Sequence, residues 1–196
     1  NDYTSAANCF EATGRNEKAL WCKAKAHDKL DSEASTKWMK HAQFCNKEGK
    51  IGNAIDSYDK ALEGFEISNE FIQAGKLSEE IATFYIRIER KYKVMECFEK
   101  AITNYERGDS TDNSLRVLEK AIAETNDADY NWRAKFADTK SLILFQNDNK
   151  ESPKFSEQAA VFWANTDRKD NEIRSLNNAI NQLNILEKDS LKTRKK

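Results

Sequence analysis

The chain has 196 residues, a formal net charge of −1, and a third of its residues charged, with both signs interspersed. This balance argues against a nucleic-acid-binding protein, which needs a basic surface, and is typical of long amphipathic helices with solvated outer faces. Ten Phe, six Tyr and four Trp residues can fill a core, so the polar average does not indicate disorder.

Apolar residues recur every three or four positions along most of the chain, which predicts consecutive amphipathic helices. Helix-breaking residues are rare, since there is one proline, Pro153, and there are six glycines. The predicted helices cover residues 2–13, 16–30, 31–48, 51–65, 68–88, 94–105, 115–123, 129–145, 155–163 and 173–183. Residues 146–152 are expected to form a polar loop, and residues 192–196 a frayed tail.

Glycines and short polar side chains mark the predicted helix ends. Gly14 and Gly49 end the first and third helices, because glycine tolerates the left-handed backbone conformation found at helix C-termini. Asn16 is expected to cap the second helix, and Asp31 or Ser32 the third, since their side-chain oxygens can accept hydrogen bonds from free backbone N–H groups.

A motif returns after 40 residues. Residues 41–65, HAQFCNKEGKIGNAIDSYDKALEGF, align without a gap with residues 81–105, IATFYIRIERKYKVMECFEKAITNY. A recurrence over two helix lengths predicts a solenoid of helix pairs, a fold that usually serves as a binding surface. The matching positions are Ala42 with Ala82, Phe44 with Phe84, Tyr58 with Phe98, Lys60 with Lys100, Ala61 with Ala101, and Phe65 with Tyr105.

The aromatic residues that recur with the repeat are interpreted as core, since they occupy equivalent positions. Charged residues that do not recur are the better candidates for function. Four of them surround one turn between helices, where a solvated face is the competing interpretation: Arg87, Arg90, Lys91 and Lys93.

The spacing of the motif changes after Gly108. The E-K-A-I run at residues 99–102 comes back at residues 119–122, an offset of 20, which is half a repeat. Either one helix has been lost at this point or a segment is absent.

The residues that usually carry catalysis or bind cofactors are missing from this pattern. His27 and His41 are not part of an H-x-x-x-H or H-E-x-x-H motif, and a structural or surface role is expected for both. Phosphate-binding glycine loops and a G-x-S-x-G elbow are absent. We therefore predict that the chain is not an enzyme and has neither a cofactor nor a metal site.

Cysteine usage and hydropathy suggest a cytosolic protein. No cysteine pair has the C-x-x-C spacing, which argues against a zinc or disulfide framework. No apolar run is long enough to span a membrane, and no signal peptide is visible. Because the first residues resemble the inside of a helix, we expect a further segment before residue 1. Reduced, buried thiols are predicted at Cys9, Cys22, Cys45 and Cys97.

Several motifs, in order, resemble the soluble NSF attachment proteins, the SNAP family. Residues 3–10, YTSAANCF, resemble that family's Y-x-x-A-A-N-x-F helix, and residues 54–63, AIDSYDKALE, resemble its E-A-I-x-x-x-x-x-A-I-E helix. Residues 99–105, EKAITNY, resemble its E-K-A-I-x-x-Y run, and residues 129–134, DYNWRA, its D-Y-F-F-K-A helix start. The resemblance covers residues 1–125 and is gapped beyond them.

The resemblance implies an adaptor that binds assembled SNARE complexes and recruits the hexameric ATPase NSF, which unwinds them. The family's basic residues meet the acidic SNARE surface, and by alignment of the surrounding runs Lys76, Arg116 and Lys120 fall at such positions. The family's membrane-attaching loop would lie before residue 1. Its acidic C-terminal stretch and ATPase-stimulating leucine are not matched, since Leu191 precedes a basic tail, which puts ATPase stimulation by this chain in doubt.

Together these patterns predict an all-α protein: a right-handed solenoid of antiparallel, tetratricopeptide-like helix pairs with a C-terminal helical bundle. Residues 1–125 are assigned to the solenoid and residues 126–196 to the C-terminal region continuous with it. The predicted function is SNARE-complex adaptor in vesicle trafficking, and the alternative is a generic scaffold that binds a peptide or partner in its groove. A cytoplasmic location at the membrane periphery and a monomeric free state are expected.

Overall fold

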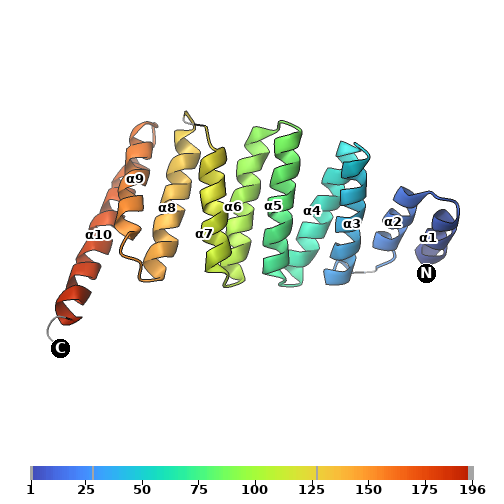
Figure 1. Ribbon diagram of the computed structural model, residues 1–196, viewed down its shortest axis with the longest axis horizontal. Helices are drawn as coiled ribbons and strands as arrows, with labels where there is room; N and C mark the ends of the chain where they lie inside the picture. The colour runs from blue at the N-terminus through green and yellow to red at the C-terminus, as the bar shows by residue number, and fades with distance from the viewer. Residues whose placement is uncertain (1, 28, 127, 194–196) are drawn as a thin grey trace. The chain divides into compact units, whose positions relative to one another are not determined.

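The structure, a computed structural model, describes residues 2–27, 29–126 and 128–193, and of residues 189–193 the backbone alone. Within these ranges it consists of α-helices without a strand (Figure 1), which confirms the predicted all-α class. The helices are α1 (Asp2–Ala12), α2 (Asn16–Lys25), α3 (Ser32–Lys47), α4 (Ile51–Ile67), α5 (Phe71–Arg87), α6 (Lys91–Arg107), α7 (Thr111–Glu124), α8 (Tyr130–Gln146), α9 (Ser152–Ala164) and α10 (Lys169–Thr193).

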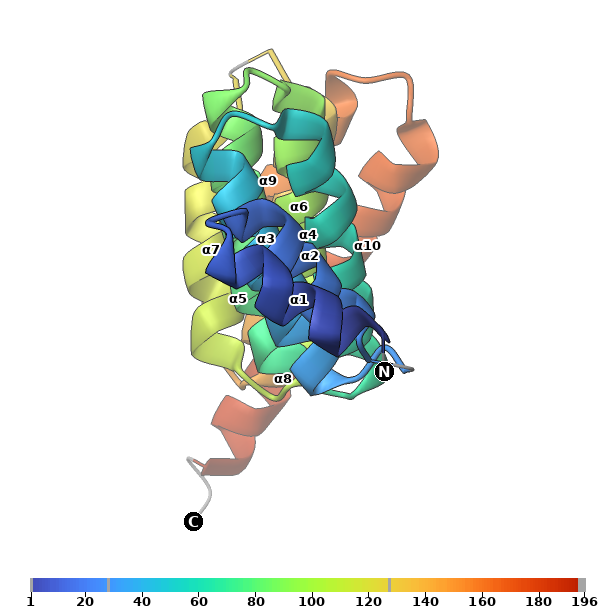
Figure 2. The same cartoon turned by 90° about the vertical axis from the view of Figure 1, so that its right-hand side faces the viewer.

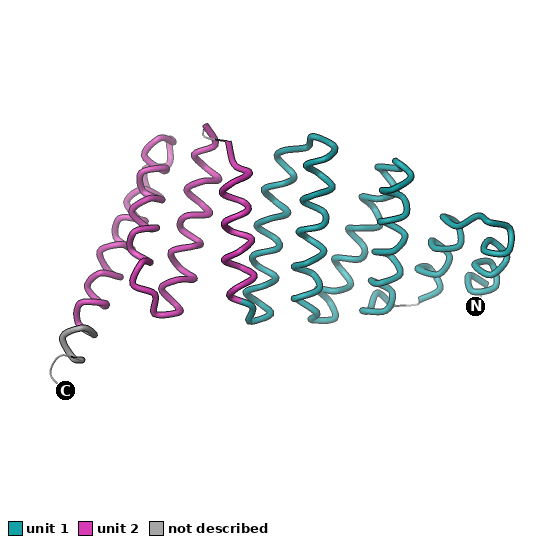
Figure 3. The backbone as a smooth tube through the Cα atoms, in the orientation of Figure 1, with its two compact units in different colours: residues 1–110 teal, residues 111–196 magenta. Residues whose placement is uncertain are grey.

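The chain divides into two compact units, residues 1–110 and 111–196 (Figure 3). In the first unit α1 packs on α2, α3 on α4, and α5 on α6, while α2·α3 and α4·α5 contacts join successive pairs. Figure 2 shows the odd-numbered helices α3 and α5 on one side of this unit and α4 and α6 on the other. In the second unit α9 packs against both α8 and α10. The predicted division after residue 125 stays a prediction.

Helices α4, α5 and α6 are equal in length, with 17 residues each, and short turns of equal length separate them. The helices from α4 to α7 therefore begin at a constant interval, at Ile51, Phe71, Lys91 and Thr111. This interval equals the offset between the two E-K-A-I runs, so the run occupies the same turn of α6 and of α7. The half-repeat offset is therefore the length of one helix with its turn, and the alternatives of a lost helix or an absent segment after Gly108 stay predictions.

Each of these turns has one residue in the left-handed conformation, with φ of 72° at Gly49, 57° at Asn69, 59° at Glu89 and 51° at Asp109. The next residue donates its backbone N–H to the carbonyl five positions back. Lys50 donates in this way to Cys45 at 2.8 Å, and the residue after the left-handed one does the same in each of the other turns. This is the Schellman arrangement, which satisfies carbonyls that the helix end leaves free.

The helix starts predicted from the sequence agree less well with the structure than the helix ends do. Asp31 caps α3 as predicted, because its carboxylate accepts the backbone N–H of Ala34 at 2.9 Å. The prediction for α2 is wrong: Arg15 occupies the cap position without a side-chain hydrogen bond, Asn16 is already helical, and α2 ends at Lys25 rather than near residue 30. Of the predicted frayed tail, residues 194–196 lie outside the described residues.

The apolar residues that recur after 40 positions form the core, as predicted. Both members of the matched apolar pairs are buried, with at most 4% of the residue exposed, except that Phe44 is half-buried. The pairs are Ala42 and Ala82, Tyr58 and Phe98, Ala61 and Ala101, and Phe65 and Tyr105. The prediction of four buried thiols is wrong for Cys9, which is exposed, and Cys97 is only partly buried.

Small residues and buried tyrosines determine how closely α5 packs against its neighbouring helices. A Cβ atom on Gly75 would lie 2.8 Å from the ring of Tyr105, so only glycine permits this contact between α5 and α6. The Tyr105 hydroxyl donates to Glu79 at 2.7 Å, and the Tyr58 hydroxyl of α4 donates to Glu80 at 2.8 Å. Both hydroxyls are thus satisfied inside the unit, which avoids the cost of burying them unpaired.

A single carboxylate links the three helices α8, α9 and α10 of the second unit. Asp138 on α8 accepts hydrogen bonds from the Trp163 indole on α9 at 2.7 Å and from the Ser175 hydroxyl on α10 at 2.6 Å. Trp163 also packs in a buried cluster with Ala134, Ala137 and Ala159. Because one acceptor serves two helices, their rotation about α8 is restricted.

The left-handed turn predicts opposite effects for two glycine-to-alanine substitutions. Gly49→Ala should lower the free energy of unfolding by about 1 kcal/mol, because its φ of 72° disfavours a Cβ atom. Gly52→Ala, three residues later inside α4, should raise it by about the same amount, since alanine favours helix. Both sites are open around the added Cβ. Thermal or urea unfolding gives the comparison, and equal signs for the two variants would contradict the assigned turn.

Candidate functional site

The three predicted partner-binding residues lie on two helices. Lys76 is exposed on α5. Arg116 is exposed and Lys120 partly buried on α7, and they are four residues apart, so they share one face of that helix. The Arg116 guanidinium donates to the Asn113 side chain at 3.3 Å. The structure therefore brings Arg116 and Lys120 together, while Lys76 belongs to the other compact unit, and partner binding by the three stays a prediction.

The basic turn between α5 and α6 is partly occupied by contacts within the chain. The Arg87 guanidinium donates to the Asn46 side chain of α3, and the Lys93 ammonium lies 2.6 Å from a Glu96 carboxylate oxygen. Arg90 and Lys91 are exposed at the turn itself. A solvated face therefore accounts for this turn, and two of its four cations already have acidic or amide partners.

A cleft of about 230 Å³ opens among α2, α3 and α4, which the sequence did not indicate. Two tryptophans form part of its wall, and the Lys60 ammonium lies 4.4 Å from the centre of the Trp38 ring, a cation–π contact. The cleft is lined by Glu17, Lys18, Trp21, Trp38, His41, Asn53, Asp56, Ser57 and Lys60. Aromatic surface and both charge signs thus meet at this point of the first unit.

His41 lies at the inner side of this cleft and is only 3% exposed. The Ser57 hydroxyl donates its one hydrogen to the Asn53 carbonyl at 2.7 Å, so it can only accept at its 2.8 Å contact with His41 Nδ1. The neutral imidazole therefore carries its hydrogen on Nδ1 and a lone pair on Nε2. Burial lowers the pKa of His41, because the charged ring would lose its hydration.

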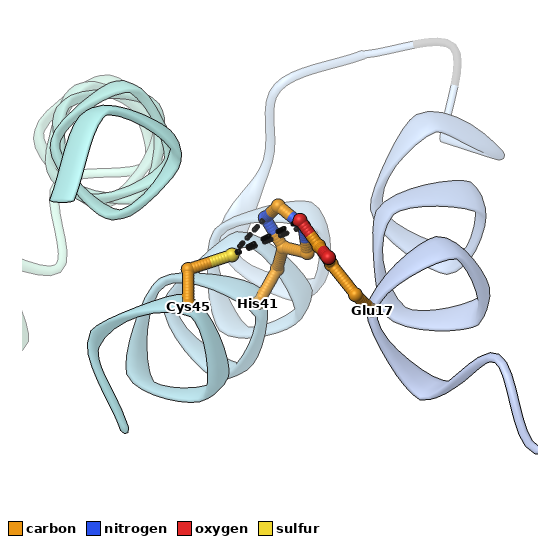
Figure 4. A group of neighbouring side chains, drawn as sticks. All are labelled: Glu17, His41 and Cys45. Carbon is orange, nitrogen blue, oxygen red and sulfur yellow. Dashed lines mark hydrogen bonds between the residues drawn. The ribbon is translucent and has the colours of Figure 1, made fainter. Parts of the chain in front are cut away.

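Two further ionisable groups lie beside His41 (Figure 4). Cys45 follows it by one helical turn, with Sγ 3.5 Å from His41 Nε2, and Glu17 of α2 brings a carboxylate oxygen 3.9 Å from the same sulfur. Burial raises the pKa of the Cys45 thiol to about 11. The hydrogen bond from Lys50 lowers the pKa of Glu17, so its carboxylate is ionised and paired.

Glu17, His41 and Cys45 offer three potential metal-ligand atoms within 4.8 Å of one another. The sequence did not indicate a metal site, because the histidine and cysteine spacings typical of zinc sites are absent from it. The four-residue spacing of His41 and Cys45 on one helix was visible in the sequence, but the third member depends on how α2 packs on α3. His27, by contrast, lies 3.9 Å from the exposed Glu33 and away from this group.

Comparisons with known proteins point to one family. A sequence model described as "Soluble NSF attachment protein, SNAP" matches residues 1–138, that is, 138 of the 196 residues. A curated relative from Neurospora crassa, "Probable vesicular-fusion protein sec17 homolog", is 28% identical over 127 residues, which cover 64% of this chain and 42% of the relative. The chain thus spans less than half the length of that relative.

One solved structure is matched over most of its length. It is titled "Crystal structure of YrrB: a TPR protein with an unusual peptide-binding site", it is 19% identical, and the match covers 85% of this chain and 93% of that chain with a TM-score of 0.35.

The buried imidazole predicts a pH dependence of stability. Because the folded state lowers the pKa of His41, the unfolded chain binds the proton more readily, so stability is full above the unfolded pKa of about 6.5 and falls as the pH drops below it. His41→Asn, which can still donate to Ser57, should flatten the urea-unfolding free energy between pH 7.5 and 5.5. His27→Asn is the matched control and should keep the wild-type slope. An unchanged slope in His41→Asn would show that His41 is not held neutral.

Proposed function

Because the chain belongs to the soluble NSF attachment protein (SNAP) family, we propose that it is an adaptor that binds assembled SNARE complexes and recruits an NSF-type ATPase for their disassembly. The family match over residues 1–138 carries this proposal, since it includes α1 to α7 and all three basic positions. The Neurospora crassa relative, whose name describes a vesicular-fusion protein, supports the same role.

The proposed contact with the SNARE bundle is electrostatic. Lys76 and Arg116 extend into solvent, and Lys120 is partly exposed one turn beyond Arg116. Cations spread over separate helices can follow an elongated acidic partner, steer its approach and fix its register. Since an exposed ion pair contributes about 1 kcal/mol or less, binding depends on several such pairs and weakens as salt is added.

The adaptor itself performs no chemistry in this proposal, and the ATPase supplies the work. The two groups that come nearest to a catalytic pair are His41 and Cys45. A thiol whose pKa is raised to about 11 stays protonated at neutral pH, whereas a nucleophilic cysteine needs a lowered pKa. Their arrangement therefore favours a structural role over nucleophilic catalysis.

We place the protein in the cytoplasm, at the periphery of membranes, because that is where assembled SNARE complexes are accessible to a SNAP adaptor. In the described part of the chain, none of the helices combines the length and the apolar character needed to cross a bilayer.

The alternative is a scaffold that takes a peptide into a groove. The cleft among α2, α3 and α4 favours it, since Trp21 and Trp38 offer apolar surface beside Lys18 and Lys60. A scaffold of this kind would bind a flexible segment as well as a folded one, whereas a SNARE adaptor requires the assembled four-helix bundle. The two proposals therefore differ in the partner state that binds.

Charge reversal at the proposed contact should weaken binding to a purified, assembled SNARE complex. We expect Lys76→Glu to raise Kd at least about fivefold at low salt, since it removes one pair worth about 1 kcal/mol and adds a repulsion. Arg116→Glu combined with Lys120→Glu should have a larger effect. Biolayer interferometry at two salt concentrations measures both Kd and its salt dependence.

Lys47→Glu is the matched control, because Lys47 is an exposed lysine of the same unit and its reversal changes the net charge equally. It should bind as the wild type does. Absence of wild-type binding at low salt, with or without the ATPase, would contradict the adaptor proposal. Equal binding to unassembled SNARE segments would favour the peptide scaffold instead.

A further inference from the structure

We propose that Glu17, His41 and Cys45 bind one divalent transition-metal ion of the Zn²⁺ class, and that this ion joins α2 to α3. The inference concerns a part of the first unit that the adaptor proposal does not use. It rests on the ligand types, on their distances, on the hydrogen bond that orients His41, and on the cleft that gives access.

The three side chains are ligands that Zn²⁺ prefers: a thiol sulfur, an imidazole nitrogen and a carboxylate oxygen. His41 and Cys45 are four residues apart on α3, so the helix itself places them on one face. Glu17 comes from the first turn of α2, which packs against α3. Two ligands from one helix and a third from its neighbour would fill three positions of a tetrahedral metal site and leave the fourth open.

The distances between these atoms suit a tetrahedral ion. With metal–ligand bonds of about 2.0–2.3 Å, neighbouring ligand atoms in a tetrahedron lie about 3.6 Å apart. Cys45 Sγ lies 3.5 Å from His41 Nε2 and 3.9 Å from the Glu17 oxygen. The same sulfur lies 3.9 Å from His41 Nδ1, so its distances to the two ring nitrogens are similar. Coordination therefore requires the Cys45 thiol to turn toward the lone pair on His41 Nε2, while the Ser57 hydrogen bond holds the imidazole.

His41 Nδ1, the ring nitrogen that would not bind the metal, has the kind of hydrogen-bond partner found in metal-binding histidines. Metal-ligating imidazoles usually donate their other ring N–H to an oxygen, which leaves the lone pair on the metal side. Here Nδ1–H donates to Ser57 Oγ at 2.8 Å, and that hydroxyl is held by the Asn53 carbonyl. The chain thus supplies both a first ligand with a lone pair on Nε2 and the group that orients it.

An ion can reach the three ligands through the cleft among α2, α3 and α4, which Glu17 and His41 both line. Water from the cleft would take the fourth position. Binding requires that Cys45 lose its proton to solvent. It also requires that Glu17 Oε1, the oxygen nearest the sulfur, give up the hydrogen bond that it accepts from the Asn53 side-chain amide at 2.9 Å. Lys50 pairs with the other oxygen, Oε2, so its positive charge lies beside the site and opposes a second cation there.

Cobalt is the direct probe, because Co²⁺ replaces Zn²⁺ in tetrahedral sites and its thiolate complexes absorb strongly in the near ultraviolet. Titration of the purified, chelator-treated chain with CoCl₂ should give one equivalent bound, with a thiolate-to-cobalt band that Zn²⁺ then removes. The band reports coordination by sulfur and depends on no adaptor activity, so its outcome is separate from that of SNARE binding.

Variants identify the ligands. Cys45→Ser should abolish the thiolate band, whereas Cys9→Ser, which changes an exposed cysteine outside the group, should keep it. Ser57→Ala should weaken Co²⁺ binding about tenfold, the usual effect of losing an orienting partner. Glu17→Gln should weaken it more strongly. Lys50→Met should tighten binding several-fold, since it removes a positive charge that pairs with the other Glu17 oxygen beside the site.

The proposal also predicts that Zn²⁺ raises the midpoint of thermal unfolding of the wild type and of Lys50→Met, and leaves that of Glu17→Gln unchanged. Glu17 is partly exposed, so this variant is expected to fold even if Cys45→Ser does not. Absence of a thiolate band at saturating Co²⁺, its loss in Cys9→Ser, or its persistence in folded Cys45→Ser would overturn the site.

Discussion

The central constraint in the first unit is the turn with one left-handed residue that ends α3, α4, α5 and α6. Four such turns, at Gly49, Asn69, Glu89 and Asp109, follow one another at a constant spacing along the chain. Because each turn closes with the same backbone hydrogen bonds, successive helices begin in the same register. Side chains at equivalent positions of successive helices are therefore buried to a similar extent. Small residues can pack against aromatic ones at each helix pair without a change in the backbone.

Much of this architecture could be predicted from the sequence, because apolar periodicity and glycines act locally. Gly14 and Gly49 marked helix ends correctly, and the 40-residue recurrence identified the core. The turns at Asn69, Glu89 and Asp109 were not recognised as members of the same series, because their left-handed residues are not glycine. The offset of 20 residues was consequently not recognised as the length of one helix with its turn. Helix α2 was predicted, but its cap residue and its end were not, since its cap position has no capping side chain.

The candidate sites differ in how far the sequence could lead to them. Lys76, Arg116 and Lys120 came from alignment to a family, because an exposed lysine has no local pattern that reveals its partner. The group of Glu17, His41 and Cys45 arises where α2 packs on α3, so it depends on tertiary contact. It also lies outside the regular series formed by α4, α5 and α6, since α2 is a much shorter helix.

The adaptor account is tested most directly by locating the partner on the surface of the chain. A photo-crosslinking residue placed at position 76 should form an adduct with the assembled SNARE bundle, because Lys76 is exposed on α5 and proposed to face it. The same residue at position 47 should form none. Crosslinking from position 47 but not from position 76, or from neither under conditions where the wild-type chain binds, would contradict the account.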